Sequence, residues 1–264
     1  MYFQNHPSSG LRYSFKQLKV LTRKFASALV KRGLKKGDVL AIYIPNKAQY
    51  PIVYYGSLFL GLTVTTINPQ YKAQELVHQL RDCGAKYIIT DQEHLSCAQR
   101  ACLQVGIAIT FTIEKVKGFE SFDELIQDDG SRFPSNVNIN PKDDVAVLLY
   151  SSGTTGLPKG CMLTHYNLIA VSCILGEDHF LNWETHSVVL TILPLFHGYG
   201  QSTMMGMALW KGCELVVLQG FDPKMFLQTL EDSKVSSVHL ILNIKISSSL
   251  VMLVSSSVVP SNYH

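Results

Sequence analysis

The sequence predicts an α/β protein with largely parallel sheets and flanking helices, and two observations lead to this class. Apolar β-branched runs alternate with segments of helical periodicity along most of the 264 residues. One strand and one helix together take about 20–25 residues, a spacing typical of crossover helices between parallel strands. Hydrophobic residues make up 47% of the chain and charged residues 16%, which allows a substantial core and excludes a disordered chain.

The first predicted element is an amphipathic helix over residues 15–32, with apolar side chains near a 3.6-residue period. Lysines and arginines cover the rest of its surface. A membrane-surface helix is one interpretation, and a core-packed helix with a solvated charged face is the favoured one. Strands are then expected at 39–44, 63–67, 87–90 and 107–113, with helices at 49–60, 72–82 and 92–104.

The polar stretch over residues 114–140 is expected to be a linker or surface excursion between two runs of strand–helix units. Strands follow at 145–150, 188–193, 214–218 and 235–240, with helices at 165–175 and 223–232 and an apolar segment at 203–210. The expected organisation is a flexible lead-in (1–10), two subdomains (about 11–135 and 141–239) and a divergent tail (240–264). The tail is set apart by seven serines and a single charged residue, Lys245.

Several classes of protein are excluded by charge and composition. The net charge of +3 is too small for a dedicated nucleic-acid binder. No apolar stretch reaches the roughly 20 residues of a membrane-spanning helix, so no transmembrane segment is expected. The six cysteines contain no CxxC pair and indicate reduced thiols of an intracellular protein.

The most informative segment begins after Tyr150, where an apolar strand leads into three glycines, four hydroxyl side chains and one lysine within residues 151–160. Glycines bring main-chain amides close to an anion, hydroxyl groups add donors, and a lysine supplies a mobile charge. A structural turn is the alternative, but ten such residues after a buried strand favour phosphate binding. No Gly-Lys-Ser/Thr follows, so an ordinary P-loop phosphotransferase is not expected.

This segment, with Cys161–His165 after it, resembles the signature of adenylate-forming enzymes of the acyl-CoA synthetase, 4-coumarate–CoA ligase and luciferase branch. Gly37–Ile42 with Pro45-Asn46, Asn68-Pro69 and Pro194–Gly200 resemble further motifs of that family. The resemblance covers about residues 13–239. It implies an incomplete N-terminal adenylation domain with two βα subdomains.

The resemblance also implies a chemistry and the residues that carry it. A carboxylate and ATP, with Mg²⁺, would give an acyl-adenylate and pyrophosphate, and coenzyme A would then take the acyl group as a thioester. The cofactor-binding set implied for the β- and γ-phosphates is Ser151, Ser152, Gly153, Thr154, Thr155, Gly156 and Lys159. The implied catalytic residues are Lys159 and His197, and His197 would orient the carboxylate.

His197 and the apolar segment 203–210 each have a simpler structural interpretation. A histidine beside aromatic residues, as His197 is, more often belongs to a packed core, and only the motif favours a substrate role. The apolar segment 203–210 either lines the acyl pocket or is part of the core. The remaining histidines lack metal-ligand spacing, so no metal-binding residue is predicted.

Parts of the family pattern have no counterpart in this sequence. They are a Tyr-Gly-x-Thr-Glu segment, whose glutamate helps to hold Mg²⁺, and a small C-terminal lid domain. We therefore expect a truncated ligase that is inactive alone. The alternative is a non-catalytic fragment that binds phosphate or acyl groups or acts as an interaction module.

The expected partners are a small-molecule carboxylic acid of fatty-acid or phenylpropanoid metabolism, ATP and coenzyme A. Uncovered strand edges and apolar surface favour chaperone association as well. Cytoplasm and peroxisome are both open as the compartment.

Overall fold

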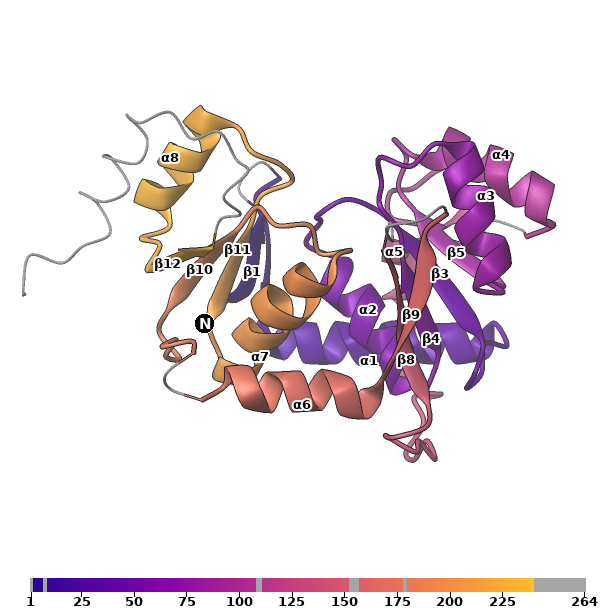
Figure 1. The fold of residues 1–264 in the computed structure, drawn as a ribbon, viewed down its shortest axis with the longest axis horizontal. Helices are drawn as coiled ribbons and strands as arrows, with labels where there is room; N and C mark the ends of the chain where they lie inside the picture. Colours follow the sequence, from indigo (N-terminus) through magenta and orange to yellow (C-terminus); the bar gives the residue numbers. More distant parts are fainter. Residues whose placement is uncertain (1, 7–8, 108–110, 152–156, 178–179, 240–264) are drawn as a thin grey trace, which may run out of the picture.

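The computed structural model describes residues 2–6, 9–107, 111–151, 157–177 and 180–239, and it confirms the predicted α/β class. Two sheets lie next to each other with helices between them and on their outer faces (Figure 1). The predicted tail (240–264) lies outside the described residues. No helix in the described ranges is long and apolar enough to cross a bilayer.

The larger sheet has seven strands in the order β7-β6-β5-β3-β4-β8-β9. All of its neighbouring strands are parallel except β8 and β9. Its strands are β3 (Val39–Tyr43), β4 (Thr63–Thr66), β5 (Tyr87–Thr90), β6 (Phe111–Thr112), β7 (Glu120–Ser121), β8 (Val145–Ser151) and β9 (Lys159–Thr164).

The smaller sheet has five strands in the order β12-β10-β11-β1-β2, and only β1 and β2 are antiparallel. Its strands are β1 (Tyr2–His6), β2 (Leu11–Ser14), β10 (Val188–Thr191), β11 (Glu214–Val217) and β12 (Ser237–His239). The helices are α1 (Phe15–Lys31), α2 (Tyr50–Phe59), α3 (Ala73–Asp82), α4 (Leu95–Val105), α5 (Phe122–Leu125), α6 (His165–Leu175), the π-helix η1 (Tyr199–Gly206), α7 (Met207–Lys211) and α8 (Pro223–Asp232).

Three clusters of buried side chains show how these elements are layered. The largest cluster lies between the sheets and joins Ile42 of β3 to Val189 of β10. A second cluster packs α3 and α4 on the other face of the seven-stranded sheet, and a third packs α8 on the outer face of the five-stranded sheet. Helices therefore cover both faces of each sheet, as parallel strands require.

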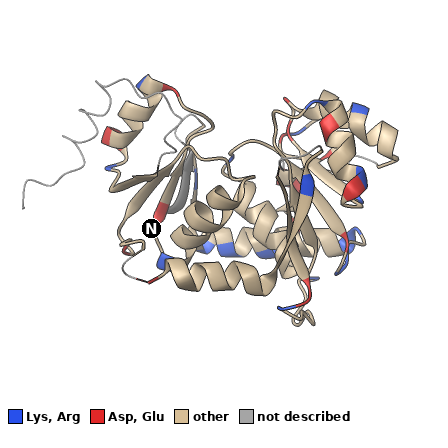
Figure 2. Cartoon of the chain, in the orientation of Figure 1, with Lys and Arg blue, Asp and Glu red and all other residues tan. Residues whose placement is uncertain are grey.

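The favoured interpretation of the first helix is confirmed. Leu18, Phe25 and Leu29 of α1 are buried in the core, while its lysines and arginines lie along the outside (Figure 2). One of these cations, Lys31, pairs with Asp128 and Asp129. In contrast, α6 carries no charged residue and has no buried residue.

The structure differs from the expected organisation in four places. The lead-in 1–10 is not flexible at Tyr2–His6, because Gln4 pairs with Leu215 in a sheet. Residues 159–164 form β9, a strand that the sequence analysis did not predict, and the polar stretch 114–140 contains β7 and α5. The sheets also cross the predicted subdomain division, since β8 and β9 complete the first sheet and β1 and β2 belong to the second.

Candidate active site

The glycine-rich segment connects the two strands of a hairpin. Ser151 ends β8 and Lys159 begins β9, and these two residues are paired in the antiparallel ladder. Both are exposed. Residues opposite each other in such a ladder lie about 5 Å apart, so a hydroxyl group and an ammonium group stand at the two ends of the segment. Five of the predicted phosphate-binding residues lie outside the described residues: Ser152, Gly153, Thr154, Thr155 and Gly156.

His197 lies on the loop between β10 and η1 and is exposed. Its main-chain N–H donates to the carbonyl of Pro194 (3.1 Å), and its Nδ1 accepts a bond from the Tyr199 N–H (3.4 Å). An accepting Nδ1 leaves the proton of the neutral ring on Nε2. The imidazole is therefore accessible and oriented by main-chain contacts, and it is not the core histidine of the simpler interpretation.

Two glycines let this loop pack closely. A Cβ on Gly198 would lie 3.1 Å from Cδ1 of Leu149, which is in β8 two residues before Ser151. A Cβ on Gly200 would lie 2.7 Å from the carbonyl carbon of Pro194 and closer still to its oxygen, so no other residue fits there. The His197 loop thus folds back on itself and lies against the strand that leads into the glycine-rich segment.

Gln201 and Thr66 hold the loop in place, and the sequence analysis did not single out either of them. The Thr66 hydroxyl donates to the carbonyl of Phe196 (2.7 Å). The Gln201 amide donates to the Thr66 hydroxyl (2.8 Å) and to the same carbonyl (3.1 Å). A buried glutamine needs internal partners, but Gln201 is followed by Ser202 and Thr203 in η1, so no local pattern in the sequence sets it apart.

The other side of the loop contacts the five-stranded sheet through Tyr199. Its hydroxyl lies 2.8 Å from Nδ1 of His239 in β12. Burial lowers the pKa of His239 and raises that of Tyr199. Both groups are therefore neutral near pH 7, with the phenol as donor and the imidazole as acceptor. The loop is fixed to both sheets.

A small cavity of about 150 Å³ lies where the carboxyl ends of strands from both sheets meet. Each of its lining residues follows the end of β3, β4, β10 or β11: Pro45, Asn46, Asn68, Pro69, Gln70, Ile192, Pro194, Phe196 and Gln219. The carboxyl ends of parallel strands are where α/β proteins bind ligands. Of the two predicted site loops, the His197 loop lines this cavity through Pro194 and Phe196.

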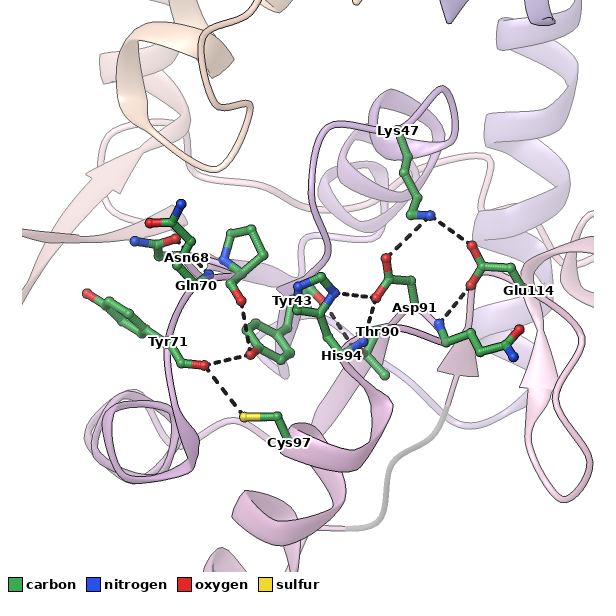
Figure 3. A network of polar contacts seen from close by, with 12 residues as sticks. Tyr43, Lys47, Asn68, Gln70, Tyr71, Thr90, Asp91, His94, Cys97 and Glu114 are labelled. Carbon is green, nitrogen blue, oxygen red and sulfur yellow. Dashed lines mark hydrogen bonds and ion pairs between the residues drawn. The ribbon is translucent and has the colours of Figure 1, made fainter. Parts of the chain in front are cut away.

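A polar network fixes the neighbouring loops along this edge (Figure 3). The Tyr43 hydroxyl lies 3.2 Å from the Pro69 carbonyl oxygen and 2.8 Å from that of Tyr71, which holds the loop after β4. Lys47 joins the buried Asp91 (3.3 Å) to Glu114 (2.8 Å), linking the loops after β3, β5 and β6. These contacts hold the loops at the carboxyl ends of β3, β4, β5 and β6 in place.

Asp91, Glu93 and His94 form the one group among the described residues that has the composition of a metal site. The ammonium of Lys47 already lies beside Asp91, and Nδ1 of His94 contacts the other oxygen of that carboxylate at 2.6 Å. A second cation would be repelled by Lys47. The group fits an ion-pair network and does not fit Mg²⁺.

A larger cavity of about 640 Å³ lies between α2, α6 and the η1–α7 segment. Ser202, Gly206, Leu209 and Trp210 face it, while Met204, Met205, Met207 and Ala208 are buried in the core. Other parts of its lining come from Tyr54, Tyr55, Leu58, Phe59, Phe133, His165, Leu168 and Ile169. The segment 203–210 therefore both contributes to the core and lines an apolar cavity.

The two sheets, which pack on one core and whose strands end around one cavity, define a class of two-sheet α/β domain. Comparison with known proteins identifies the family within that class. The family model described as AMP-binding enzyme matches residues 2–244. The chain belongs to the AMP-binding enzyme family, which confirms the resemblance.

Among its relatives, the 4-coumarate–CoA ligase of Pinus taeda is 35% identical over 228 residues, covering 85% of this chain and 42% of the pine enzyme. A long-chain-fatty-acid–CoA ligase from Archaeoglobus fulgidus has a similar structure, with a TM-score of 0.82 and 26% identity over 90% of this chain and 48% of that one. ATP-bound MatB from Rhodopseudomonas palustris shares the fold, with a TM-score of 0.77 and 24% identity over 90% of this chain and 45% of MatB. The chain therefore spans less than half the length of these proteins.

Proposed function

We propose that the chain forms the nucleotide- and acid-binding part of an ATP-dependent acid–thiol ligase of the acyl-CoA synthetase type. The observation that carries this proposal is the convergence of two loops at one sheet edge. Gly198, next to His197, packs on Leu149 only two residues before Ser151. An acid oriented by His197 and a triphosphate bound at the glycine-rich segment would then be neighbours.

The proposed reaction has two balanced steps. A carboxylate oxygen attacks the α-phosphorus of ATP, forming the acyl–phosphate bond as the bond to pyrophosphate breaks. The thiol of coenzyme A then loses its proton to solvent, its sulfur attacks the acyl carbon, and AMP leaves as the thioester forms. Negative charge accumulates on pyrophosphate in the first step, so donors placed beside it lower the barrier.

In this proposal the residues of the glycine-rich segment bind the β- and γ-phosphates. Ser151, Ser152, Thr154 and Thr155 supply hydroxyl donors, Gly153 and Gly156 allow close main-chain approach, and Lys159 supplies the positive charge. The exposed ammonium of Lys159 suits a ligand that arrives from solvent. Mg²⁺ would come with ATP, and we assign no ligand of this chain to it.

His197 orients the carboxylate in this proposal. With the proton of its neutral ring on Nε2, the imidazole can donate a hydrogen bond to an acid oxygen. The cavity of about 640 Å³ would accept the apolar body of the acid. Both the pine and the Archaeoglobus relatives are named for acids with a large apolar part, which supports an apolar carboxylic acid as the substrate class.

Three further expectations belong to the same proposal. All six cysteines are free thiols, which supports a reducing compartment, either cytoplasm or peroxisome. The uncharged, exposed helix α6 presents Tyr166, Ile169 and Ile174 to solvent, a surface that a chaperone would recognise. The domain is proposed to include β1 as well, so that it runs from residue 2 to residue 239 instead of beginning at residue 11.

The test is calorimetric titration of the chain with MgATP, comparing Lys159→Ala with the control Lys224→Ala. Lys224 is also an exposed lysine, and it lies on α8. Loss of a charged donor should raise the Kd for MgATP by about tenfold or more, while the control binds as wild type does. Both variants should unfold at the wild-type urea concentration because both side chains are exposed. Equal affinity of Lys159→Ala and wild type would overturn the proposal.

A second measurement asks whether the chain is catalytic by itself. The chain is incubated with MgATP, coenzyme A and a medium-chain or hydroxycinnamic acid, and AMP and acyl-AMP are quantified. Release of AMP that depends on the acid would rule out the non-catalytic alternative. Binding of MgATP without acid-dependent AMP is the result expected of a ligase part that is inactive alone.

A further inference from the structure

One face of α3 contacts the glycine-rich segment at both of its ends, through polar side chains that the proposed chemistry does not use. We call these ends, at Tyr150 and at Pro158, the two stems of the segment. His78 and Asp82 are four residues apart, so they lie on the same side of the helix one turn apart. Nε2 of His78 lies 3.0 Å from the carbonyl oxygen of Pro158, and it must be the donor because a carbonyl only accepts. The hydroxyl of Tyr150 donates to Oδ2 of Asp82. Tyr150 directly precedes the segment (residues 151–160), and Pro158 lies near its end, next to Lys159.

The contact with Tyr150 depends on Gly160. Tyr150 and Gly160 are paired across the β8–β9 ladder. A Cβ on Gly160 would lie 3.0 Å from Cζ of Tyr150 and 3.1 Å from its hydroxyl oxygen. The glycine therefore leaves room for the tyrosine ring to cross β9 toward α3. Burial, and then the bond to Asp82, raises the pKa of Tyr150, so its hydroxyl stays a proton donor.

The helix itself is firmly attached to the sheet. The buried amide of Gln79 donates to the Thr65 hydroxyl (2.9 Å) and the Thr66 carbonyl (3.1 Å) at the end of β4. Leu76 and Leu80, on the inner face of α3, are fully buried. A cavity of about 260 Å³ separates α3 from Leu157 and Pro158, so the second stem is not held there by close apolar packing. The two polar contacts join a fixed helix to the stems.

We propose that His78 and Asp82 are positioning residues, which hold the two stems of the glycine-rich segment in the arrangement that binds a nucleoside triphosphate. This inference rests on the proposed function, because it concerns the same site. It adds that α3, a helix with no motif of its own, sets the affinity of the segment for the nucleotide. The alternative is a general contribution to stability, which would leave nucleotide affinity unchanged.

The experiment measures three quantities for each variant: the Kd for MgATP, the urea midpoint, and hydrogen exchange of the amides of residues 151–160 without nucleotide. The variants are Asp82→Asn, Tyr150→Phe, His78→Leu and His78→Gln. Two controls match them: Asp232→Asn, which changes the last residue of α8 as Asp82 is the last of α3, and Tyr87→Phe in β5 of the same sheet.

Loss of one positioning bond should raise the Kd for MgATP roughly threefold to tenfold and accelerate exchange in residues 151–160. The urea midpoints should stay near those of the controls. His78→Gln keeps an N–H donor, so we expect it to bind MgATP within about twofold of wild type. The double variant of Asp82 and Tyr150 should bind no more weakly than either single variant, since one bond joins them.

Lys159→Ala distinguishes failure of the inference from failure of the proposed function. If it binds MgATP as wild type does, the proposed function is wrong. If it weakens binding while Asp82→Asn, Tyr150→Phe and His78→Leu bind and exchange as the controls do, the inference alone is overturned. The inference is also overturned if these variants have a lower urea midpoint but an unchanged Kd for MgATP, because the contacts then contribute only to stability.

Discussion

Gly200 shows how one residue determines the shape of the His197 loop. Its α-carbon lies so close to Pro194 that an added Cβ would be 2.7 Å from the carbonyl carbon of that residue. We predict that Gly200→Ala lowers the free energy of unfolding by about 3 kcal/mol, because main-chain atoms cannot yield as a side chain can. Urea denaturation measures this.

Gly220 provides the control for this prediction. Nothing lies within 4 Å of a Cβ placed there, and the residue is exposed. Gly220→Ala should therefore change the free energy of unfolding by less than about 0.5 kcal/mol. Equal stability of the two variants would show that the loop can move away from Pro194.

At the scale of elements, Asp38 holds the turn between α1 and β3 against β5. Its carboxylate accepts a hydrogen bond from the Lys35 N–H (3.0 Å) and pairs with Lys86 (2.7 Å). Burial by itself would raise the pKa of Asp38, but these contacts outweigh it and lower the pKa below its ordinary value. The folded chain thus favours the ionised carboxyl more than the unfolded chain does.

The sign of the pH dependence follows from this direction. Stabilisation by Asp38 is present above the unfolded pKa of about 3.9 and is lost as the pH falls through the lower folded pKa. We predict that Asp38→Asn is less stable than wild type by about 2 kcal/mol at pH 7. This difference should shrink below pH ~4. Urea midpoints from pH 7 to pH 3 test it, and a difference independent of pH would contradict it.

At the scale of the whole molecule, Asn46 joins the two sheets. This buried side chain follows β3, and its amide donates to the carbonyls of Leu193 and Leu218 (both 3.0 Å) after β10 and β11. Its oxygen accepts from the N–H of Leu195 (2.8 Å). We predict that Asn46→Ala lowers the free energy of unfolding by about 3 kcal/mol, because buried main-chain groups lose their partners.

The measurement is chemical denaturation, followed by tryptophan fluorescence. Trp183 lies shortly before β10 and Trp210 lies in α7. Asn136→Ala, at an exposed position, is the control and should stay within about 0.5 kcal/mol of wild type. If Asn46→Ala matched this control, other contacts would suffice to hold the sheets together.

Helices with a clear periodic face were predicted well from the sequence. The spacing of apolar residues placed α1, α3 and α8 within about two residues of their ends, because a helix that buries one face repeats its apolar residues at a local period. The hairpin strand β9 was missed, since glycine, lysine and exposed side chains give it no alternating pattern. Main-chain hydrogen bonds to β8 stabilise this strand, and an alternation of side chains cannot predict such bonds.

In the candidate site too, local sequence patterns were predicted and the contacts between separate segments were not. The type and order of residues after Tyr150 indicated a phosphate-binding segment, and the Pro194–Gly200 motif indicated His197. Neither Gln201 and Thr66, which hold the His197 loop, nor Asp82 and His78, which contact the stems, could be assigned in advance. The contacts of Thr66 with Gln201, of His78 with Pro158 and of Asp82 with Tyr150 each join residues between 68 and 135 positions apart.

The sequence by itself determined the α/β class, the order of most elements, the family and the chemical character of the glycine-rich segment. These properties depend on local periodicity and on short runs of residue types. The tertiary structure alone decided that β1 joins β11, that β8 and β9 complete the first sheet, and that Asn46 connects the sheets. The physical reason is that a main-chain donor or acceptor can pair with any partner, so only packing of the whole chain selects which distant segments meet.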